Sequence, residues 1–132
     1  MGAPRSAGGI CATLRDVGRF GDMVRNRGRV GDEQIVPEWW IDDIRTKGDP
    51  VAWASGSMAK LMPRGRYRGK WYSTGNERGA FCAIGIHGQW IYIDPTSEVV
   101  IVKLSSQPLP LDDTMDGLLL SAFDAISRSL GG

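Results

Sequence analysis

The segment 79–105 constrains the fold of this chain more strongly than any other part of it. Aromatic and β-branched residues dominate three short apolar runs there, which cover residues 81–86, 90–93 and 99–104. Gly, Pro and Asp residues separate the runs, and this punctuation is typical of antiparallel strands joined by tight turns. The sequence therefore predicts a three-strand meander with corners at His87-Gly88 and at Asp94-Pro95-Thr96.

Two helices are predicted before the meander. Thr13 followed by Asp16 is a variant of the capping box and predicts a helix over 13–27, whose apolar stripe comprises Leu14, Val17, Phe20 and Val24. Pro37 suits the first position of a helix and predicts a second helix that ends at Thr46. The inward side of this second helix is expected to comprise Trp40, Ile41 and Ile44.

The C-terminal residues predict one more helix. Asp112 or Asp113 caps it, and its wide apolar face comprises Leu118, Leu119, Ala122, Phe123, Ile126 and Leu130. A strand over 70–74 precedes the meander, whereas the segment 51–70 is typical of loops with at most one short strand. We therefore expect an α+β fold in which helices cover one or both faces of an antiparallel sheet of about four strands.

The composition excludes several classes of function. The chain has 132 residues, which suits a single domain over 1–132, and its 16 basic residues nearly balance its 15 acidic ones. A balanced charge gives no electrostatic basis for binding nucleic acid or an anionic membrane, and no apolar run approaches the roughly 20 residues that span a bilayer. The N-terminus lacks the apolar core of a signal peptide, so we expect a cytoplasmic protein that binds neither nucleic acid nor membranes.

The cysteine and histidine content argues against a metal centre. Cys11 and Cys82 are far apart in apolar surroundings, and we expect both to be buried free thiols. One histidine without a cysteine pair provides too few ligands for a zinc site. The sequence therefore predicts neither a metal nor a cofactor.

The bend after the first strand of the meander is the strongest candidate for a functional site. Gly85 and Gly88 let another backbone or a ligand approach closely, and the only histidine of the chain, His87, lies between them. His87 either positions a substrate and accepts a proton or makes a structural hydrogen bond, and the structural role is the commoner one. Aromatic residues on the sheet either line a substrate cleft or, more usually, pack in the core. The candidates are Trp71, Tyr72 and Trp90.

Several phrases of the sequence resemble one protein family. The phrase Gly8-Gly-Ile-Cys-Ala-Thr-Leu-Arg-Asp-Val-Gly-Arg-Phe20 is similar to a helix entry of the penicillin-recognising serine hydrolases, the class C β-lactamase-like esterases and amidases. Within that family, four further phrases look most like the 6-aminohexanoate-dimer (nylon-oligomer) hydrolases: Lys70-Trp-Tyr, Asn76-Glu-Arg-Gly-Ala-Phe, Ala83-Ile-Gly-Ile-His-Gly-Gln and Ser105-Ser-Gln-Pro. The resemblance runs from about residue 7 to about residue 130 and implies a partial β-lactamase/transpeptidase-like fold.

The resemblance also implies where the reaction centre lies. The third active-site box of the family, Lys-Thr-Gly in β-lactamases, falls on Ala83-Ile84-Gly85, so the backbone N–H of Ile86 is implied to be an oxyanion-hole donor. Ala83 and Ile84 replace the Lys and Thr that would hold a substrate carboxylate. This departure points away from β-lactams and toward linear amides or carboxylic esters as small-molecule substrates. The implied substrate-binding residues are Gly85, His87, Gly88 and Trp90.

The nucleophile and the general base of the family lie upstream of Gly8-Gly9, in a Ser-x-x-Lys box and a Tyr-x-Asn or Tyr-x-x box. The resemblance therefore implies that this chain corresponds to the C-terminal third of a serine hydrolase and is inactive by itself. The alternative is a non-catalytic truncated module. Such a module would self-associate into a homo-oligomer through the apolar surface left uncovered.

A literal Ser-x-x-Lys sequence also occurs within the chain, at Ser57-Met58-Ala59-Lys60. In such a motif a lysine one helical turn away activates the serine. We expect a chance match here, because the motif lies in a loop-like region between Pro50 and Pro63. Neither Tyr67 nor Tyr72 has support as its partner base.

Overall fold

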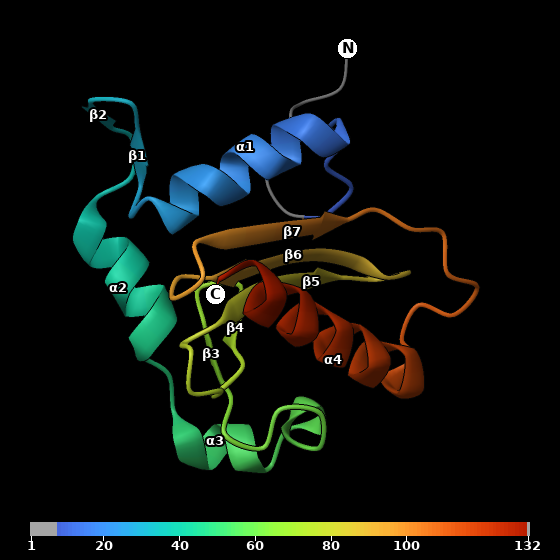
Figure 1. Cartoon of the computed structure of the whole chain (residues 1–132). Helices are drawn as coiled ribbons and strands as arrows, with labels where there is room; N and C mark the ends of the chain where they lie inside the picture. Colours follow the sequence, from blue (N-terminus) through green and yellow to red (C-terminus); the bar gives the residue numbers. More distant parts are fainter. Residues whose placement is uncertain (1–7, 132) are drawn as a thin grey trace.

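The computed structural model describes residues 8–131. A five-stranded antiparallel sheet lies at its centre, with the strands in the order β3-β4-β5-β6-β7 (Figure 1). The strands are β3 (Arg66–Arg68), β4 (Trp71–Ser73), β5 (Phe81–Gly85), β6 (Gln89–Asp94) and β7 (Val99–Lys103). The helices are α1 (Leu14–Arg25), α2 (Glu38–Thr46), α3 (Pro50–Ala54) and α4 (Asp113–Leu130). The α+β fold and the meander are therefore confirmed, and β3 adds a strand to the expected sheet.

Local capping explains where most helices begin. Thr13 caps α1 as predicted, since its Oγ1 atom accepts the N–H of Asp16 at 3.1 Å. Asp112, one of the two predicted caps, begins α4 by accepting the N–H of Met115 at 3.0 Å. The prediction for Pro37 is wrong by one position, because Pro37 has an extended ψ of 134° and precedes the first helical residue of α2.

The segment expected to be mostly loop contains a short helix, α3, and a 3₁₀ turn, η1 (Ser57–Ala59). Asp49 caps α3 through its Oδ1 atom, which accepts the N–H groups of Val51 at 2.8 Å and Ala52 at 3.2 Å, and Pro50 occupies the first turn. An Asp-Pro pair is a recognised helix start. A small ribbon of β1 (Arg29–Val30) and β2 (Glu33–Gln34) joins α1 to α2.

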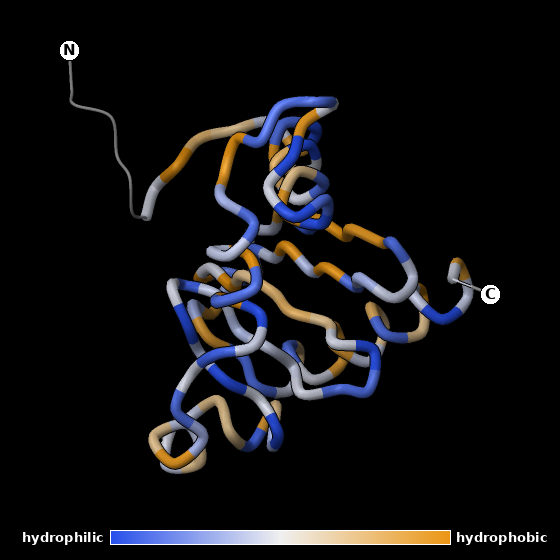
Figure 2. Tube along the Cα trace, turned by 90° about the vertical axis from the view of Figure 1, so that its left-hand side faces the viewer, coloured by the Kyte–Doolittle hydropathy of each residue, from blue (hydrophilic) through white to orange (hydrophobic). Residues whose placement is uncertain are grey.

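The sheet separates two cores, and helices cover both of its faces (Figure 1). Side chains from α1 and α2 form the first core with one face of the strands; its buried residues are Met23, Val24, Ile41, Ile44, Trp71, Phe81 and Ile93. Side chains from α3 and α4 form the second core with the other face; its buried residues are Trp53, Met62, Ala80, Cys82, Trp90, Tyr92 and Phe123. Hydrophobic segments accordingly lie in the strands beneath α1, whereas the outer turns are mostly hydrophilic (Figure 2).

Gly21 allows helix α1 to lie close to the sheet. An added Cβ at Gly21 would lie only 2.6 Å from Val100 Cγ1, so the helix lies closer to β7 than a side chain would allow. The predicted apolar stripe is right for Val24, which is buried, and wrong for Leu14 and Phe20, which are exposed. The helix therefore meets the sheet through Gly21 and the buried Met23 and Val24, and the partly exposed Phe20 still stacks its ring on Trp71 of β4, with 6.3 Å between the ring centroids.

Helix α4 has apolar residues on two sides, and only one side packs. Phe123 is buried and Leu119 packs against the same core, as predicted. The predicted face is wrong for Leu118, Ala122, Ile126 and Leu130, which are exposed. The outward side of α4 is therefore an apolar surface within the described chain.

The two cysteines differ in environment. Cys82 is buried as predicted, whereas the prediction for Cys11 is wrong, because it lies exposed in the segment before α1. No helix in residues 8–131 is long and apolar enough to cross a bilayer.

Candidate functional site

The candidate site lies on the hairpin that joins β5 to β6. The ladder between these strands ends with the pair Gly85↔Gln89, and the three residues between them form the turn. His87 and Gly88 both have left-handed backbones, with φ of 60° and 78°. An added Cβ at Gly88 would lie 2.2 Å from Gln107 Oε1. The left-handed backbone at position 88 therefore favours glycine, and a side chain there would also displace the Gln107 side chain.

The segment after β7 clamps this turn. The backbone N–H of His87 donates to the carbonyl of Pro110 at 3.1 Å, and the carbonyl of His87 accepts the N–H of Gln107 at 3.2 Å. The Gln89 side chain adds a further bond by accepting the N–H of Ser105 at 3.0 Å. The tip of the hairpin is thus held from two sides by a segment that is distant in sequence.

The His87 ring takes part in the same clamp. Its Nδ1 atom lies 2.8 Å from the carbonyl oxygen of Gln107. Because a carbonyl oxygen can only accept, Nδ1 carries a proton and donates it to this oxygen. His87 therefore makes the structural hydrogen bond that was the commoner expectation. Its other expected role, at a substrate, stays a prediction.

One edge of β5 is open over its C-terminal half. The ladder between β4 and β5 contains only the pairs Ser73↔Phe81 and Tyr72↔Cys82. Residues 83–85 of β5 therefore pair with a strand on the β6 side alone, within the part of the chain that the structure describes. β5 is central in the sheet, yet residues 83–85 lack a strand partner on the β4 side within residues 8–131, next to the bend where a ligand is expected to approach.

The amide of Ile86 points toward this open edge. Backbone groups of successive residues in an antiparallel strand point alternately to the two neighbouring strands. Ala80 directs its carbonyl to the β4 side, where it accepts the N–H of Thr74 at 3.0 Å, so the alternation turns the Gly85 carbonyl toward β6. The following peptide is trans, and its N–H, that of Ile86, consequently points the opposite way. The Ile86 side chain is 63% exposed.

The sequence as a whole matches one known family. The family model named Beta-lactamase matches residues 1–123. The chain belongs to the beta-lactamase family. This beta-lactamase family chain is 37% identical over 123 residues to 6-aminohexanoate-dimer hydrolase of Paenarthrobacter ureafaciens, a match that covers 93% of the chain and 31% of the relative. The resemblance drawn from the sequence phrases is therefore confirmed.

A solved structure supports the same assignment. The structure named "Putative 6-aminohexanoate-dimer hydrolase from Bacillus anthracis" matches with a TM-score of 0.72 and 34% sequence identity, over 90% of this chain and 29% of that one. The beta-lactamase family chain described here thus spans about a third of the length of the relatives that it matches.

Other aromatic candidates of this beta-lactamase family chain lie away from the hairpin surface. Trp90 is 1% exposed, and its ring meets the ring of Phe123 edge-on at 5.7 Å between centroids. Trp71 is buried in the core on the opposite face of the sheet. Both residues therefore follow the commoner expectation of core packing.

The Ser-x-x-Lys sequence lies on η1, beside a pocket of about 330 Å³. Ser57 and the two tyrosines that were considered as its partner base, Tyr67 and Tyr72, all line this pocket, whereas Lys60 is exposed and does not line it. Burial raises the pKa of Tyr72, with Tyr67 and Cys82 adding to the shift, so its phenol stays protonated at neutral pH and is a poor base. The pocket therefore lacks the activated serine of a catalytic centre.

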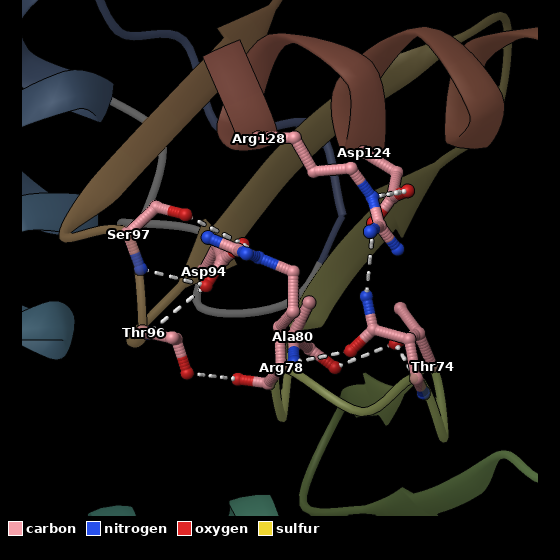
Figure 3. A network of polar contacts seen from close by, with 9 residues as sticks. Thr74, Arg78, Ala80, Asp94, Thr96, Ser97, Asp124 and Arg128 are labelled. Carbon is pink, nitrogen blue, oxygen red and sulfur yellow. Dashed lines mark hydrogen bonds and ion pairs between the residues drawn. The ribbon is translucent and has the colours of Figure 1, made fainter. Parts of the chain in front are cut away.

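A second polar region organises the opposite end of β6. Asp94 is fully buried, and its carboxylate accepts hydrogen bonds from Arg78 Nε at 2.6 Å and from the N–H groups of Thr96 at 2.9 Å and Ser97 at 3.0 Å (Figure 3). Burial opposes ionisation of Asp94, but the bonds from Arg78 and Ser97 outweigh it and hold the pKa below its usual value. Asp94 therefore builds the turn into β7, as predicted for Asp94-Pro95.

A larger pocket, of about 480 Å³, lies between α4 and the β4–β5 connection. Asp124 accepts from Arg128 Nε at 2.7 Å and lies 3.5 Å from Asn76 Nδ2, and all three residues line the pocket. Neither pocket includes Ile86 or its neighbours on the hairpin. Across residues 8–131, no group of three or more His, Cys, Asp and Glu side chains is placed to hold a metal ion.

Proposed function

We propose that this chain supplies the oxyanion-hole strand of a serine hydrolase that acts on linear amides or carboxylic esters. The reacting serine and its Lys/Tyr proton-transfer pair come from polypeptide outside residues 1–132. Membership of the beta-lactamase family supports the reaction class. The relative named 6-aminohexanoate-dimer hydrolase supports a linear amide, because two amino-acid units joined head to tail share an amide bond.

The observation that carries the proposal is the direction of the Ile86 amide at the open edge of β5. In acyl transfer the serine Oγ adds to the substrate carbonyl carbon, its proton passes to the Lys/Tyr pair, and the carbonyl oxygen takes the electron pair of the broken π bond. An N–H that the hairpin already holds in place stabilises this negative oxygen without reorganisation. The intermediate then expels the amine or alcohol, which takes a proton from the Lys/Tyr pair, and water releases the acyl group.

The side chains near this edge support the choice of substrate. Ala83 and Ile84 replace the Lys and Thr of the β-lactamase box and offer a substrate carboxylate neither a cation nor a hydroxyl group. Gly85 keeps the strand bare where the carbonyl group of a substrate approaches. His87 and Gly88 complete the proposed substrate-binding surface at the turn.

A chimera tests the proposal. The aligned segment of the Paenarthrobacter ureafaciens hydrolase is replaced with this chain, and turnover of the 6-aminohexanoate dimer and of a chromogenic ester is measured. The variant Ile86→Pro removes the N–H, and we expect kcat to fall by about 10²–10³-fold, as for loss of one oxyanion donor. The control Ile86→Val keeps the N–H and changes only an exposed side chain, so it should retain activity.

Two results would contradict this role. An Ile86→Pro chimera that folds and keeps full kcat would remove the amide from the mechanism. The isolated chain is expected to show no ester turnover above background. Turnover by the isolated chain that Ser57→Ala abolishes would instead identify Ser57 as a nucleophile.

The second candidate function is a non-catalytic module that self-associates. The outward apolar side of α4 favours it, because Leu118, Ile126 and Leu130 are all exposed. Uncovered apolar surface of this kind drives association in water. Sedimentation of the isolated chain distinguishes the two: a stable oligomer that Leu118→Glu dissociates supports the module, and a monomer at all concentrations speaks against it.

A further inference from the structure

The pocket beside η1 brings together aromatic rings from three separate elements. Trp53 of α3, Tyr67 of β3 and Tyr72 of β4 all line it (Figure 1 shows how α3 lies below β3). Its volume of about 330 Å³ falls in the range of roughly 300–1,000 Å³ that small-molecule sites occupy. Ser57 and Met58 of η1 also line it.

The rings are fixed at angles to one another. Trp53 is 8% exposed, and its Nε1 donates to the carbonyl of Met62 at 2.9 Å, which sets the plane of the indole. The rings of Trp53 and Tyr72 meet edge-on with centroids 6.2 Å apart, and those of Tyr67 and Tyr72 are tilted by 54° at 4.8 Å. Rings that meet at such angles are not stacked face to face.

The charge of the lining has one sign. Asp49 is the only charged residue in it, and no Lys, Arg or His contributes. The two arginines that flank Tyr67 on β3 both bind α2 instead of the pocket. Arg66 Nη1 donates to the carbonyl of Thr46, the last residue of α2, at 3.0 Å, and Arg68 Nε pairs with the Asp43 carboxylate at 2.6 Å. The faces of aromatic rings are themselves electronegative. The Asp49 carboxylate and the aromatic rings therefore make the pocket electronegative, which suits it to a cation.

We propose that this pocket binds an organic ammonium ion. The cationic head lies among Trp53, Tyr67 and Tyr72, where cation–π contacts hold it, and Asp49 balances its charge. The thioether of Met58 packs against the alkyl part of the ligand, and the Ser57 hydroxyl accepts a hydrogen bond from it. This site uses neither Ile86 nor the open edge of β5, so it stands independently of the proposed hydrolase role.

Paired ligands test the proposal on the full chain. Choline and 3,3-dimethylbutan-1-ol have the same shape, but a neutral carbon replaces the charged nitrogen in the alcohol. Amide and indole NMR signals are followed during titration, with the Trp53 Nε1–H as the reporter inside the pocket. We expect saturable choline shifts at the lining residues and an affinity about 2- to 30-fold higher than that of the alcohol, the span expected for cation–π contacts. Equal affinities, or no saturable choline shift at these residues, would overturn the proposal.

Variants identify the groups responsible. Tyr67 is 42% exposed on an edge strand, so Tyr67→Leu removes a ring at low structural cost and should weaken choline binding about 2- to 10-fold. Tyr67→Phe keeps the ring and should bind choline as the parent does. Asp49→Asn keeps the α3 cap but removes the charge, and should reduce the preference for choline over the alcohol.

A matched control comes from an aromatic residue outside the pocket. Trp39 on α2 is also exposed, and Trp39→Leu should leave choline binding unchanged. Melting curves show which variants fold. If Tyr67→Leu unfolds, Tyr67→Phe and Asp49→Asn still test the proposed ammonium site. Loss of choline binding in Tyr67→Phe, or an unchanged preference for choline over the alcohol in Asp49→Asn, would refute it.

Discussion

Replacing Gly21 with alanine tests how closely α1 lies against the sheet. An added Cβ there would lie 2.6 Å from Val100 Cγ1 and 3.3 Å from Ile91 Cγ2. Gly18 lies one turn earlier in the same helix, and an added Cβ there would meet no atom within 4 Å. The two substitutions are therefore chemically identical and differ only in whether the new methyl group faces the sheet.

The expected magnitudes follow from this difference. Alanine is favoured over glycine in a helix interior by about 0.5–1 kcal/mol, so Gly18→Ala should raise the free energy of unfolding by that amount. Gly21→Ala gains the same term but forces a methyl group into a filled site, which typically costs about 1–3 kcal/mol. We expect Gly21→Ala to be less stable than Gly18→Ala by about 1–3 kcal/mol.

Urea unfolding followed by circular dichroism measures both free energies, provided that the slope with denaturant is unchanged. A double-mutant cycle with Val100→Ala locates the cause, because this change removes the methyl group nearest to the new Cβ. The penalty of Gly21→Ala should shrink in the Val100→Ala background. Equal effects at positions 18 and 21, or an undiminished penalty in that background, would refute the close approach of α1.

Three further predictions concern single groups. Asp94→Asn leaves the Arg78 guanidinium without its buried partner and should lower the free energy of unfolding by about 2–4 kcal/mol. The folded pKa of Asp94 is lowered, so its contribution to stability is present above the ordinary aspartate pKa and is lost as the pH falls through the folded pKa. The stability of the variant should therefore depend less on pH in the acid range than that of the parent. In the native protein a thiol reagent should modify Cys11 quickly, and Cys82 only on unfolding, because burial raises the pKa of Cys82 and shields it; equal rates would contradict this. Burial, with nearby carboxylates, raises the pKa of Tyr92 to about 12, so Tyr92→Phe should remove the ionisation near that pH from an alkaline absorbance titration, and a titration that the substitution leaves unchanged would contradict this.

The strands of the meander could be predicted from the sequence because their signals are local. Short β-branched and aromatic runs between turn residues specify β5, β6 and β7 whatever surrounds them. The sequence allowed one short strand within 51–70 but did not place β3, because its three residues, Arg66–Arg68, are exposed and carry no apolar pattern. It is a strand because β4 offers it a pairing partner, and such pairing is not encoded in either segment alone.

The buried sides of the helices were harder to predict. Apolar residues lie on more than one side of α1 and α4, so the apolar periodicity alone allows several rotations of each helix about its axis. The sheet selects among them by shape: Gly21 fits against Val100, and Phe123 fits between Trp90 and Tyr92. Leu118 and Ile126 are left outside as a consequence.

By itself, the sequence determined the family, the central strands and the hairpin that carries Gly85 and Ile86, since these depend on residues that are neighbours in the chain. Tertiary structure decided that residues 83–85 have no strand partner on the β4 side, toward which the Ile86 amide points, and that Gln107 holds the turn beside them. It also decided that Trp53, Tyr67 and Tyr72 share one pocket. Strand pairing and packing join residues far apart in sequence, and a local pattern carries no record of them.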